Sequence, residues 1–350
     1  MRLFGLVTVL LVSATRWSVI LSQSFAALDF SEGTIKTGNS RKSFSCRSDK
    51  TVHISDYVKL PEKDKVFYTR EGENALLHLS PQVALLHDSL ETDKDETRVE
   101  FSSCAIVGNG GILKLSEFGP SIDSHSAVFR SNQAPTEGYE RIAGTKTTFR
   151  VVNKHWLIKY STGGPDWLPK EKGTVLVMGR GDQLLFKRTF GFYSHDNNLF
   201  TVRMGPQVGS RARALLLEFR RRTHCVSRRH MEGGSTPTSG LYQVLMALSL
   251  CSNVTVYGFG DGERGQYQYF SFYNTERKFG NLEVHSFDAE RALLQQLDQE
   301  GVLRLCEAKD KPSCGCRSPN GCPRLKGRSP APHLSEGGVR IVSGAWAVDV

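Results

Sequence analysis

The chain has 350 residues, of which 39% are hydrophobic and 23% are charged. This length and composition exclude a mini-protein held together by cross-links alone and a collagen-like or low-complexity chain, so most of the chain is expected to fold. The 45 basic and 36 acidic residues give a net charge of +9, which suggests an anionic substrate, a nucleic acid or an acidic surface as a partner without choosing among them.

The amino terminus has the pattern of a secretory leader. Arg2 is followed by an almost uninterrupted apolar run over residues 3–14, and Arg16 separates this run from a second, partly apolar stretch. One interpretation is a cleaved signal peptide over residues 1–26, and the other is an uncleaved signal-anchor of roughly 20 residues. Arg16 near the middle of such an anchor would cost about 2.5–3.5 kcal/mol, and both interpretations stay open.

Composition divides the chain into four regions. Residues 1–26 are the leader, and residues 27–50, which are rich in Ser, Thr, Lys and Gly, predict a weakly ordered stem. Residues 51–310 predict the main folded domain, and residues 311–350 predict a basic tail rich in Cys, Pro and Gly.

Strand and helix patterns alternate within the domain. Residues 74–91 have helical periodicity with a kink at Pro81, and residues 99–107 predict a strand that ends in a glycine-rich turn. Further strands are expected at 127–130, 147–152, 174–178 and 254–259, and helices at 211–222, 240–251 and after His285. This alternation predicts a single Rossmann-like α/β domain with a mostly parallel sheet.

Eight cysteines follow the leader. In a secreted chain they indicate disulfides rather than redox or metal sites, and the sequence alone does not pair them. They are Cys46, Cys104, Cys225, Cys251, Cys306, Cys314, Cys316 and Cys322. The last three could be read as zinc ligands, but no CxxC pair or histidine cluster completes a tetrahedral set, so no metal site is expected.

Two turns have the chemistry of a phosphate site. The Gly-Asn-Gly-Gly turn at 108–111 lets backbone approach a ligand closely, although it does not match GxGxxG. Thr238 and Ser239 begin a helix whose free amides and hydroxyls suit a phosphate, with an ordinary helix cap as the alternative. Two such turns in one parallel sheet favour a nucleotide-binding crevice outside the strand ends.

Two other features are less specific. His285 is a candidate general base, and Glu290, five residues later, would not share its helical face, which leaves a direct His–Glu pair open. The arginines at 220–222 favour a solvated helix face, because neither an aromatic platform nor a nucleic-acid motif accompanies them. No nucleic-acid partner is therefore expected.

Three of these segments together resemble the motifs of the eukaryotic sialyltransferases, glycosyltransferase family 29. Residues 104–111 (Cys-Ala-Ile-Val-Gly-Asn-Gly-Gly), 129–132 (Phe-Arg-Ser-Asn) and 144–150 (Gly-Thr-Lys-Thr-Thr-Phe-Arg) resemble the long motif. Residues 237–240 (Pro-Thr-Ser-Gly) through Cys251 to 256–259 (Val-Tyr-Gly-Phe) resemble the short motif. His285 and Glu290 match the very short motif in type and spacing, and the order of the three motifs is more specific than any one of them.

The resemblance implies a variant GT-A-like fold and a set of donor-binding residues. Asn109 and Asn132 would hold the nucleotide of CMP-sialic acid, with Gly110 allowing close approach. The phosphate and ribose would lie against the helix start at Thr238, Ser239 and Gly240, and the cytidine near Gly258. The family's disulfide would join Cys104 to Cys251.

The resemblance also implies a mechanism. His285 would be the general base of an inverting transfer that needs no metal and no cofactor, and Glu290 would be orienting or structural. The acceptor would be a glycan of a glycoprotein or glycolipid. The resemblance implies a single-pass type II protein of the Golgi membrane, or a secreted or Golgi-luminal protein if the leader is cleaved.

One position departs from the family pattern. The family usually has a His-Tyr-Tyr motif whose histidine contacts the leaving phosphate, whereas this chain has Gln268, Tyr269 and Phe270. Gln268 and Tyr269 are still expected to contact the donor, but glutamine cannot carry a proton. Two alternatives follow: an enzyme that uses another CMP-activated acidic sugar, and a non-catalytic protein that binds glycans or nucleotides.

Overall fold

The computed structural model describes residues 32–37, 40–46, 51–75, 90–92, 99–196, 199–270, 283–318 and 322. The expected leader, most of the helix expected at 74–91 and all of the tail beyond 318 except Cys322 lie outside these residues. Within the described part of the chain, no helix is both long enough and apolar enough to cross a membrane.

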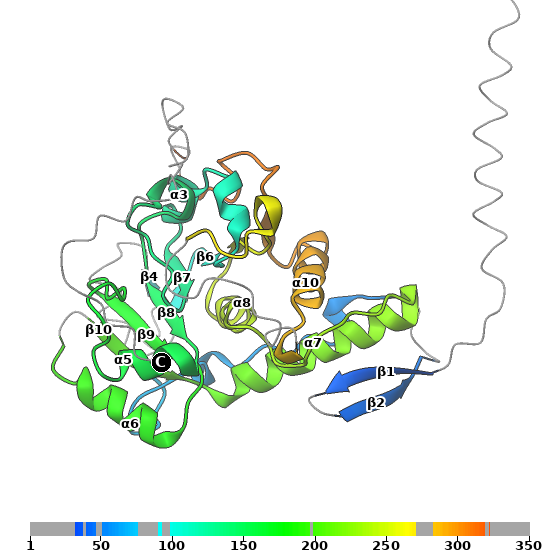
Figure 1. Cartoon of the computed structure of the whole chain (residues 1–350), viewed down its shortest axis with the longest axis horizontal. Helices are drawn as coiled ribbons and strands as arrows, with labels where there is room; N and C mark the ends of the chain where they lie inside the picture. The colour runs from blue at the N-terminus through cyan, green and yellow to red at the C-terminus, as the bar shows by residue number, and fades with distance from the viewer. Residues whose placement is uncertain are drawn as a thin grey trace, which may run out of the picture.

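An eight-stranded sheet forms the centre of the molecule (Figure 1). From one edge to the other its strands are β12 (Arg304–Cys306), β11 (Val254–Tyr257), β6 (Cys104–Val107), β7 (Ala127–Ser131), β8 (Phe149–Val152), β9 (Thr174–Met178), β10 (Leu199–Met204) and β3 (Phe67–Tyr68). All neighbouring strands are parallel except β3, which pairs antiparallel with β10 at the edge. The α/β class with a mostly parallel sheet is therefore confirmed.

Helices cover both faces of this sheet, which explains why the central strands β6, β7, β8 and β9 are buried along their whole length. Along β6, Ile106 belongs to one buried cluster and Val107 to another, as the alternation of a strand requires. The first face packs against α7 (Pro206–Ser227), α8 (Ser239–Leu250) and α10 (Phe287–Gln299). The second face packs against α3 (Gly119–Asp123), α4 (Glu140–Ala143), α5 (Lys154–Tyr160) and α6 (Gln183–Phe192).

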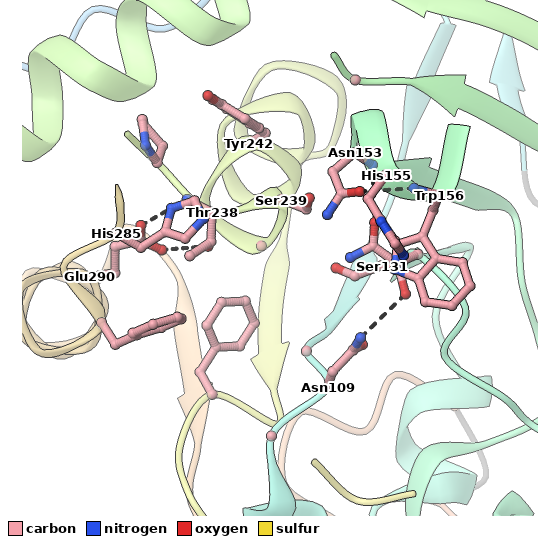
Figure 2. A pocket seen from close by; sticks show the side chains of 18 of the residues that line it. Asn109, Ser131, Asn153, His155, Trp156, Thr238, Ser239, Tyr242, His285 and Glu290 are labelled. Atoms are coloured by element: carbon pink, nitrogen blue, oxygen red, sulfur yellow. Dashed lines mark hydrogen bonds between the residues drawn. The ribbon is translucent and has the colours of Figure 1, made fainter. Parts of the chain in front are cut away.

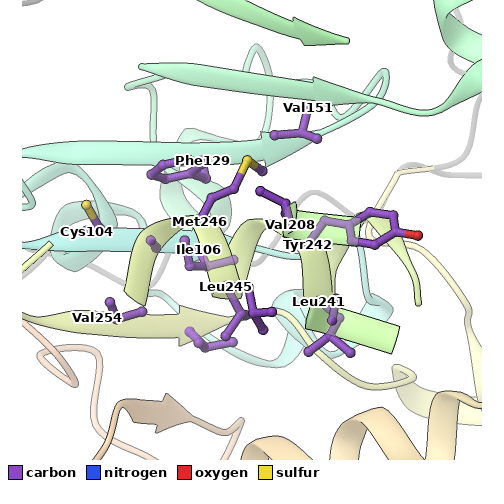
Figure 3. Packing of buried hydrophobic residues seen from close by; sticks show 14 of the residues in the cluster. Cys104, Ile106, Phe129, Val151, Val208, Leu241, Tyr242, Leu245, Met246 and Val254 are labelled. Atoms are coloured by element: carbon purple, nitrogen blue, oxygen red, sulfur yellow. The ribbon is translucent and has the colours of Figure 1, made fainter. Parts of the chain in front are cut away.

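Helix α8 is the most buried helix of the first layer. Its side chains Leu241, Leu245 and Met246 are at most 1% exposed and share a cluster with Ile106 and Phe129 of the sheet (Figure 3). This packing holds the amino-terminal turn of α8 in place at the carboxyl edge of the strands.

The strand order places a crevice between β6 and β11. From β6 the chain steps through β7, β8, β9 and β10 in one direction, and then returns through α7 and α8 to add β11 on the other side of β6. The carboxyl ends of β6 and β11 thus lie at the point where the order reverses, which is where open α/β sheets bind ligands.

Some elements differ from the sequence-based expectation. Residues 99–107 form two strands, β5 (Val99–Phe101) and β6, because Ser102 and Ser103 contact Ser126 instead of continuing one strand. Leu90, expected in a helix, begins β4 (Leu90–Thr92), which pairs with β5. Inside the stretch 27–50, β1 (Glu32–Thr37) and β2 (Ser40–Ser45) form an antiparallel hairpin, because backbone pairing does not depend on the polar composition that suggested weak order.

All eight cysteines form disulfides. The pairs are Cys46–Cys225, Cys104–Cys251, Cys306–Cys314 and Cys316–Cys322. Cys104–Cys251 is the pairing that the resemblance implied, and it joins the start of β6 to the end of α8. Cys314, Cys316 and Cys322 hold one another or Cys306, so their thiols are not available as zinc ligands.

Candidate active site

A cleft of about 1070 Å³ lies at the carboxyl ends of the parallel strands. The loops after β6, β7, β8, β9 and β11 line it, together with the first turns of α8 and α10. Figure 2 shows Thr238, His285 and Glu290 on one side and Asn109, Ser131, Asn153, His155 and Trp156 on the other. Residues that are up to about 180 positions apart in sequence therefore share one site.

Glycines allow the two central loops to cross. The Gly110 amide donates to the Gly258 carbonyl over 2.9 Å, and a Cβ atom on Gly110 would lie 2.2 Å from the Gly260 carbonyl oxygen. Gly258 itself has φ +75°, in the left-handed region that favours glycine. Side chains at these positions would force the loops after β6 and β11 apart and open the floor of the cleft.

Two asparagines follow neighbouring strands on this floor. The Asn109 amide donates weakly to the Ser131 carbonyl at 3.4 Å, and its Oδ1 is buried without a hydrogen-bond partner among the described residues. Asn132 has φ +54°, and its Oδ1 accepts from the Asn153 backbone at 3.0 Å, which fixes the loop after β7 to the loop after β8. A buried acceptor without a partner is costly, so Asn109 is suited to receive a donor group of a ligand.

The first turn of α8 forms the adjoining wall. Thr238 caps the helix, because its Oγ1 accepts from the Leu241 amide at 3.3 Å. The amides of Ser239 and Gly240 stand in the first turn, where no helical carbonyl can reach them, and a Cβ on Gly240 would lie 2.6 Å from the Phe259 ring. Free amides, a hydroxyl and the positive end of the helix dipole together can bind an anion.

Glu290 accepts two hydrogen bonds from this turn. One carboxylate oxygen accepts from the Thr238 amide at 2.8 Å and the other accepts from the Thr238 hydroxyl at 2.5 Å. The side chain is 3% exposed, and burial raises the pKa of Glu290 to about 7 against the opposing effect of these hydrogen bonds. Glu290 thus positions the helix start, and its hydrogen bonds go to Thr238 rather than to His285.

His285 lies beside the same turn with one ring nitrogen occupied. Its Nδ1 is 2.7 Å from the Thr236 carbonyl oxygen, which can only accept, so Nδ1 carries the proton of the neutral ring. Burial is the main cause that lowers the pKa of His285 below its ordinary value of 6.5. The neutral ring keeps a lone pair on Nε2, which is what a general base requires.

Gln268 and Tyr269 differ in their relation to the cleft. Gln268 lines it, pairs with Gly110 as an antiparallel bridge, and has a buried Oε1 without a hydrogen-bond partner among the described residues. Tyr269, expected to contact the donor, does not line the cleft. It is fully buried, its hydroxyl donates to the Pro135 carbonyl at 2.6 Å, and its ring packs on Tyr139.

Several cleft residues were not anticipated from the sequence. Lys154, Trp156 and Arg180 follow β8 and β9, and Tyr242 is one turn into α8. The signal available for the first three was their position just after a parallel strand, where loops gather at one edge of the sheet. Within the described residues, one group of possible metal ligands occurs, at Cys306, Asp310 and Cys314, and two of its members are joined in a disulfide.

A crevice at the switch point of a mostly parallel sheet is the place where α/β proteins of this class bind their ligands. Residues 47–302 match the family model for glycosyltransferase family 29 (sialyltransferase). Because that match covers most of the chain, the chain belongs to glycosyltransferase family 29, the sialyltransferases.

Individual relatives match over part of their length. The chain is 32% identical over 211 residues to CMP-N-acetylneuraminate-beta-galactosamide-alpha-2,3-sialyltransferase 1 of Sus scrofa, covering 59% of this chain and 58% of the relative. It is 33% identical over 233 residues to alpha-N-acetylgalactosaminide alpha-2,6-sialyltransferase 1 of Homo sapiens, covering 58% of this chain and 37% of the relative. A crystal structure of a mammalian sialyltransferase in complex with Gal-beta-1-3GalNAc-ortho-nitrophenol superposes with a TM-score of 0.48 and 20% identity over 75% of this chain and 97% of that one.

Proposed function

We propose that this protein transfers sialic acid from CMP-sialic acid to a hydroxyl of a glycan on a glycoprotein or glycolipid, with inversion and without a metal or a cofactor. The observation that carries the proposal is His285, whose Nδ1 is tied to the Thr236 carbonyl beside the anion-binding turn of α8. A base and an anion site in one cleft are what this transfer needs.

The donor nucleotide occupies the crossing of the two glycine loops. Asn109 and Asn132 bind the cytidine and ribose, and Gly110 and Gly258 admit them close to the backbone. The phosphate meets the amides of Ser239 and Gly240. Thr238, held by Glu290, keeps this turn aligned with the phosphate.

The chemical step moves one proton and exchanges two bonds. His285 Nε2 takes the proton of the acceptor hydroxyl while that oxygen bonds to the anomeric carbon from the face opposite CMP. The bond from the anomeric carbon to the phosphate oxygen breaks, and CMP leaves with the electron pair. Amides aimed at the departing phosphate stabilise the charge that develops there.

Gln268 favours a second candidate for the donor. It lines the cleft where the family usually has a histidine, and its side chain can donate a hydrogen bond to the leaving phosphate but cannot protonate it. A different CMP-activated acidic sugar, whose anomeric carbon bears the developing positive charge more easily, would need less assistance to the departing CMP and would tolerate this change. Competition between CMP-sugars for binding separates the two donors, and CMP binding without any product supports the non-catalytic alternative.

The compartment follows from the same proposal. We place the domain in the Golgi lumen, attached by residues 1–26 as a signal-anchor or released if that leader is cleaved. The four disulfides support an oxidising compartment. Protease protection of the domain in sealed vesicles, together with the mass of the mature chain, tests both parts.

The test of the activity is transfer of labelled sialic acid from CMP-sialic acid to galactose- and N-acetylgalactosamine-ended acceptors. His285→Ala should lower kcat by about 10²–10⁴-fold and leave the affinity for CMP unchanged, because the ring acts on the acceptor. The matched control is His195→Ala, which removes an exposed histidine outside the cleft. Transfer unaffected by His285→Ala refutes the base, and a wild-type protein that binds no CMP-sugar refutes the donor.

A further inference from the structure

Arg180 is a cation that the proposed reaction has not used. It lies two residues after the end of β9 and lines the cleft, and its side chain is exposed there. The preceding Gly179 amide donates to the Val152 carbonyl at 2.9 Å, which continues the β8–β9 pairing and anchors the Arg180 loop beside the loop after β8.

Other cations that line the cleft have acidic partners. Lys154 Nζ is 3.7 Å from Asp182, and the Arg291 guanidinium is 3.6 Å from Glu307. No acidic side chain of the described residues forms an ion pair with Arg180. Its guanidinium is therefore available to an anion that enters the cleft.

The positive charge of Arg180 acts on two titratable side chains of the cleft, His285 and Tyr242. Burial is the main cause that lowers the pKa of His285, and Arg180 lowers it further. Burial raises the pKa of Tyr242, and Arg180 opposes that rise. Arg180, Tyr242 and His285 come from three different elements, and all three line the cleft.

The chemistry of the proposed donor supplies an anion at this place. A sialic acid carries its carboxylate directly on the anomeric carbon, so the carboxylate is one bond away from the carbon that the acceptor oxygen attacks. Because His285 must reach that acceptor oxygen, the carboxylate must lie within a few ångströms of the base. A guanidinium binds a carboxylate through two parallel hydrogen bonds, which an ammonium cannot reproduce.

We infer that Arg180 binds the carboxylate of the donor sugar and thereby selects an acidic sugar over a neutral one. This inference rests on the proposed function. It assigns the phosphate to the α8 turn and the carboxylate to Arg180, so the two negative groups of CMP-sialic acid have separate sites.

The experiment compares CMP-sialic acid with CMP in calorimetric titrations of the wild type, Arg180→Gln and Arg180→Lys. Both ligands carry close to two negative charges at neutral pH, so long-range electrostatics nearly cancel in the comparison. Arg180→Gln should weaken CMP-sialic acid roughly 10- to 100-fold and CMP less than about twofold. Arg180→Lys should fall between the wild type and Arg180→Gln. Arg188→Gln removes an exposed charge from α6 outside the cleft and should leave both affinities unchanged.

Each other outcome overturns a distinct statement. A wild-type protein that binds neither ligand overturns the proposed function itself. Equal losses for CMP and CMP-sialic acid mean that Arg180 serves the phosphate or the fold. If a variant binds the donor as the wild type does and only its KM for acidic acceptors rises, Arg180 binds the acceptor instead of the donor, and the inference fails.

Discussion

Burial decides the protonation of the two titratable side chains that flank the first turn of α8. Glu290 is 3% exposed and its pKa rises to about 7, whereas burial holds the pKa of His285 below 6.5. Both shifts favour the neutral forms near neutral pH, but the consequences differ. A neutral imidazole is the active form of a base, whereas an uncharged Glu290 changes how Thr238 is held.

The activity should follow the protonation of His285. Because its pKa lies below 6.5, the base is neutral at pH 7, and protonation of His285 should not limit kcat around neutrality. The rate should fall tenfold for each pH unit once the pH is below that lowered pKa. Steady-state transfer rates of the wild type and Glu290→Gln between pH 5 and 8 measure this, and an acid limb that starts above pH 6.5 in both proteins would contradict the assignment.

Glu290 should make stability depend on pH. Its pKa is about 7 in the folded protein against an ordinary 4.5, so the folded state binds more protons between these values. The free energy of unfolding should therefore decrease as the pH rises through this window, by about 3 kcal/mol in total. Glu290→Gln should flatten the decrease in denaturant titrations at pH 5 and 7.5, whereas Glu232→Gln, at an exposed position, should retain it. Equal slopes in the wild type and Glu290→Gln would show that Glu290 is not the cause.

At the scale of elements, α8 joins the core to the site. Its body packs on β6 and β7 through Leu245 and Met246, and its first turn supplies Thr238, Ser239 and Gly240 to the cleft. The geometry of the first turn therefore depends on packing in the middle of the same helix.

A cavity under α8 should destabilise the whole domain. Leu245 is 1% exposed, so Leu245→Ala should lower the free energy of unfolding by about 2–5 kcal/mol. Leu184 on α6 is 77% exposed, and Leu184→Ala should change the free energy of unfolding by less than about 0.5 kcal/mol. Urea titrations compare the two variants, and similar effects would mean that the packing of α8 does not stabilise the core.

At the scale of the molecule, covalent links tie distant parts of the chain together. Cys46–Cys225 joins the residue after the β1–β2 hairpin to α7, and Cys104–Cys251 joins β6 to the end of α8. The second link closes a loop that contains strands β6 to β10, whereas β11 follows the link directly in the chain. Its removal should affect folding more than the removal of a short link.

Two disulfides that close loops of very different length allow a matched comparison. Cys104–Cys251 spans 147 positions and Cys316–Cys322 spans 6. The loop-entropy relation gives about 5 kcal/mol for the first and about 2 kcal/mol for the second. Calorimetric Tm values of the two paired Cys→Ala variants test this, and a larger loss from the short link would show that loop entropy does not dominate.

The sequence by itself determined the class of the fold and predicted most of the residues at the centre of the cleft. Strands β6, β7, β9 and β11 are mostly apolar runs that end in recognisable turns, because a strand buried on both faces is rich in apolar residues. The glycines at 108–111 and the cap at Thr238 are equally local signals, since backbone conformation and capping involve only neighbouring residues.

Only the tertiary structure decided which distant groups meet. Glu290 pairs with Thr238 rather than His285, Tyr269 packs below the cleft instead of lining it, and Arg180 faces the cleft from the loop after β9. The pairing of Cys46 with Cys225, 179 positions away, is another contact that the sequence alone did not predict. These contacts join residues from different elements, and no local pattern of polarity or spacing encodes the packing that brings them together.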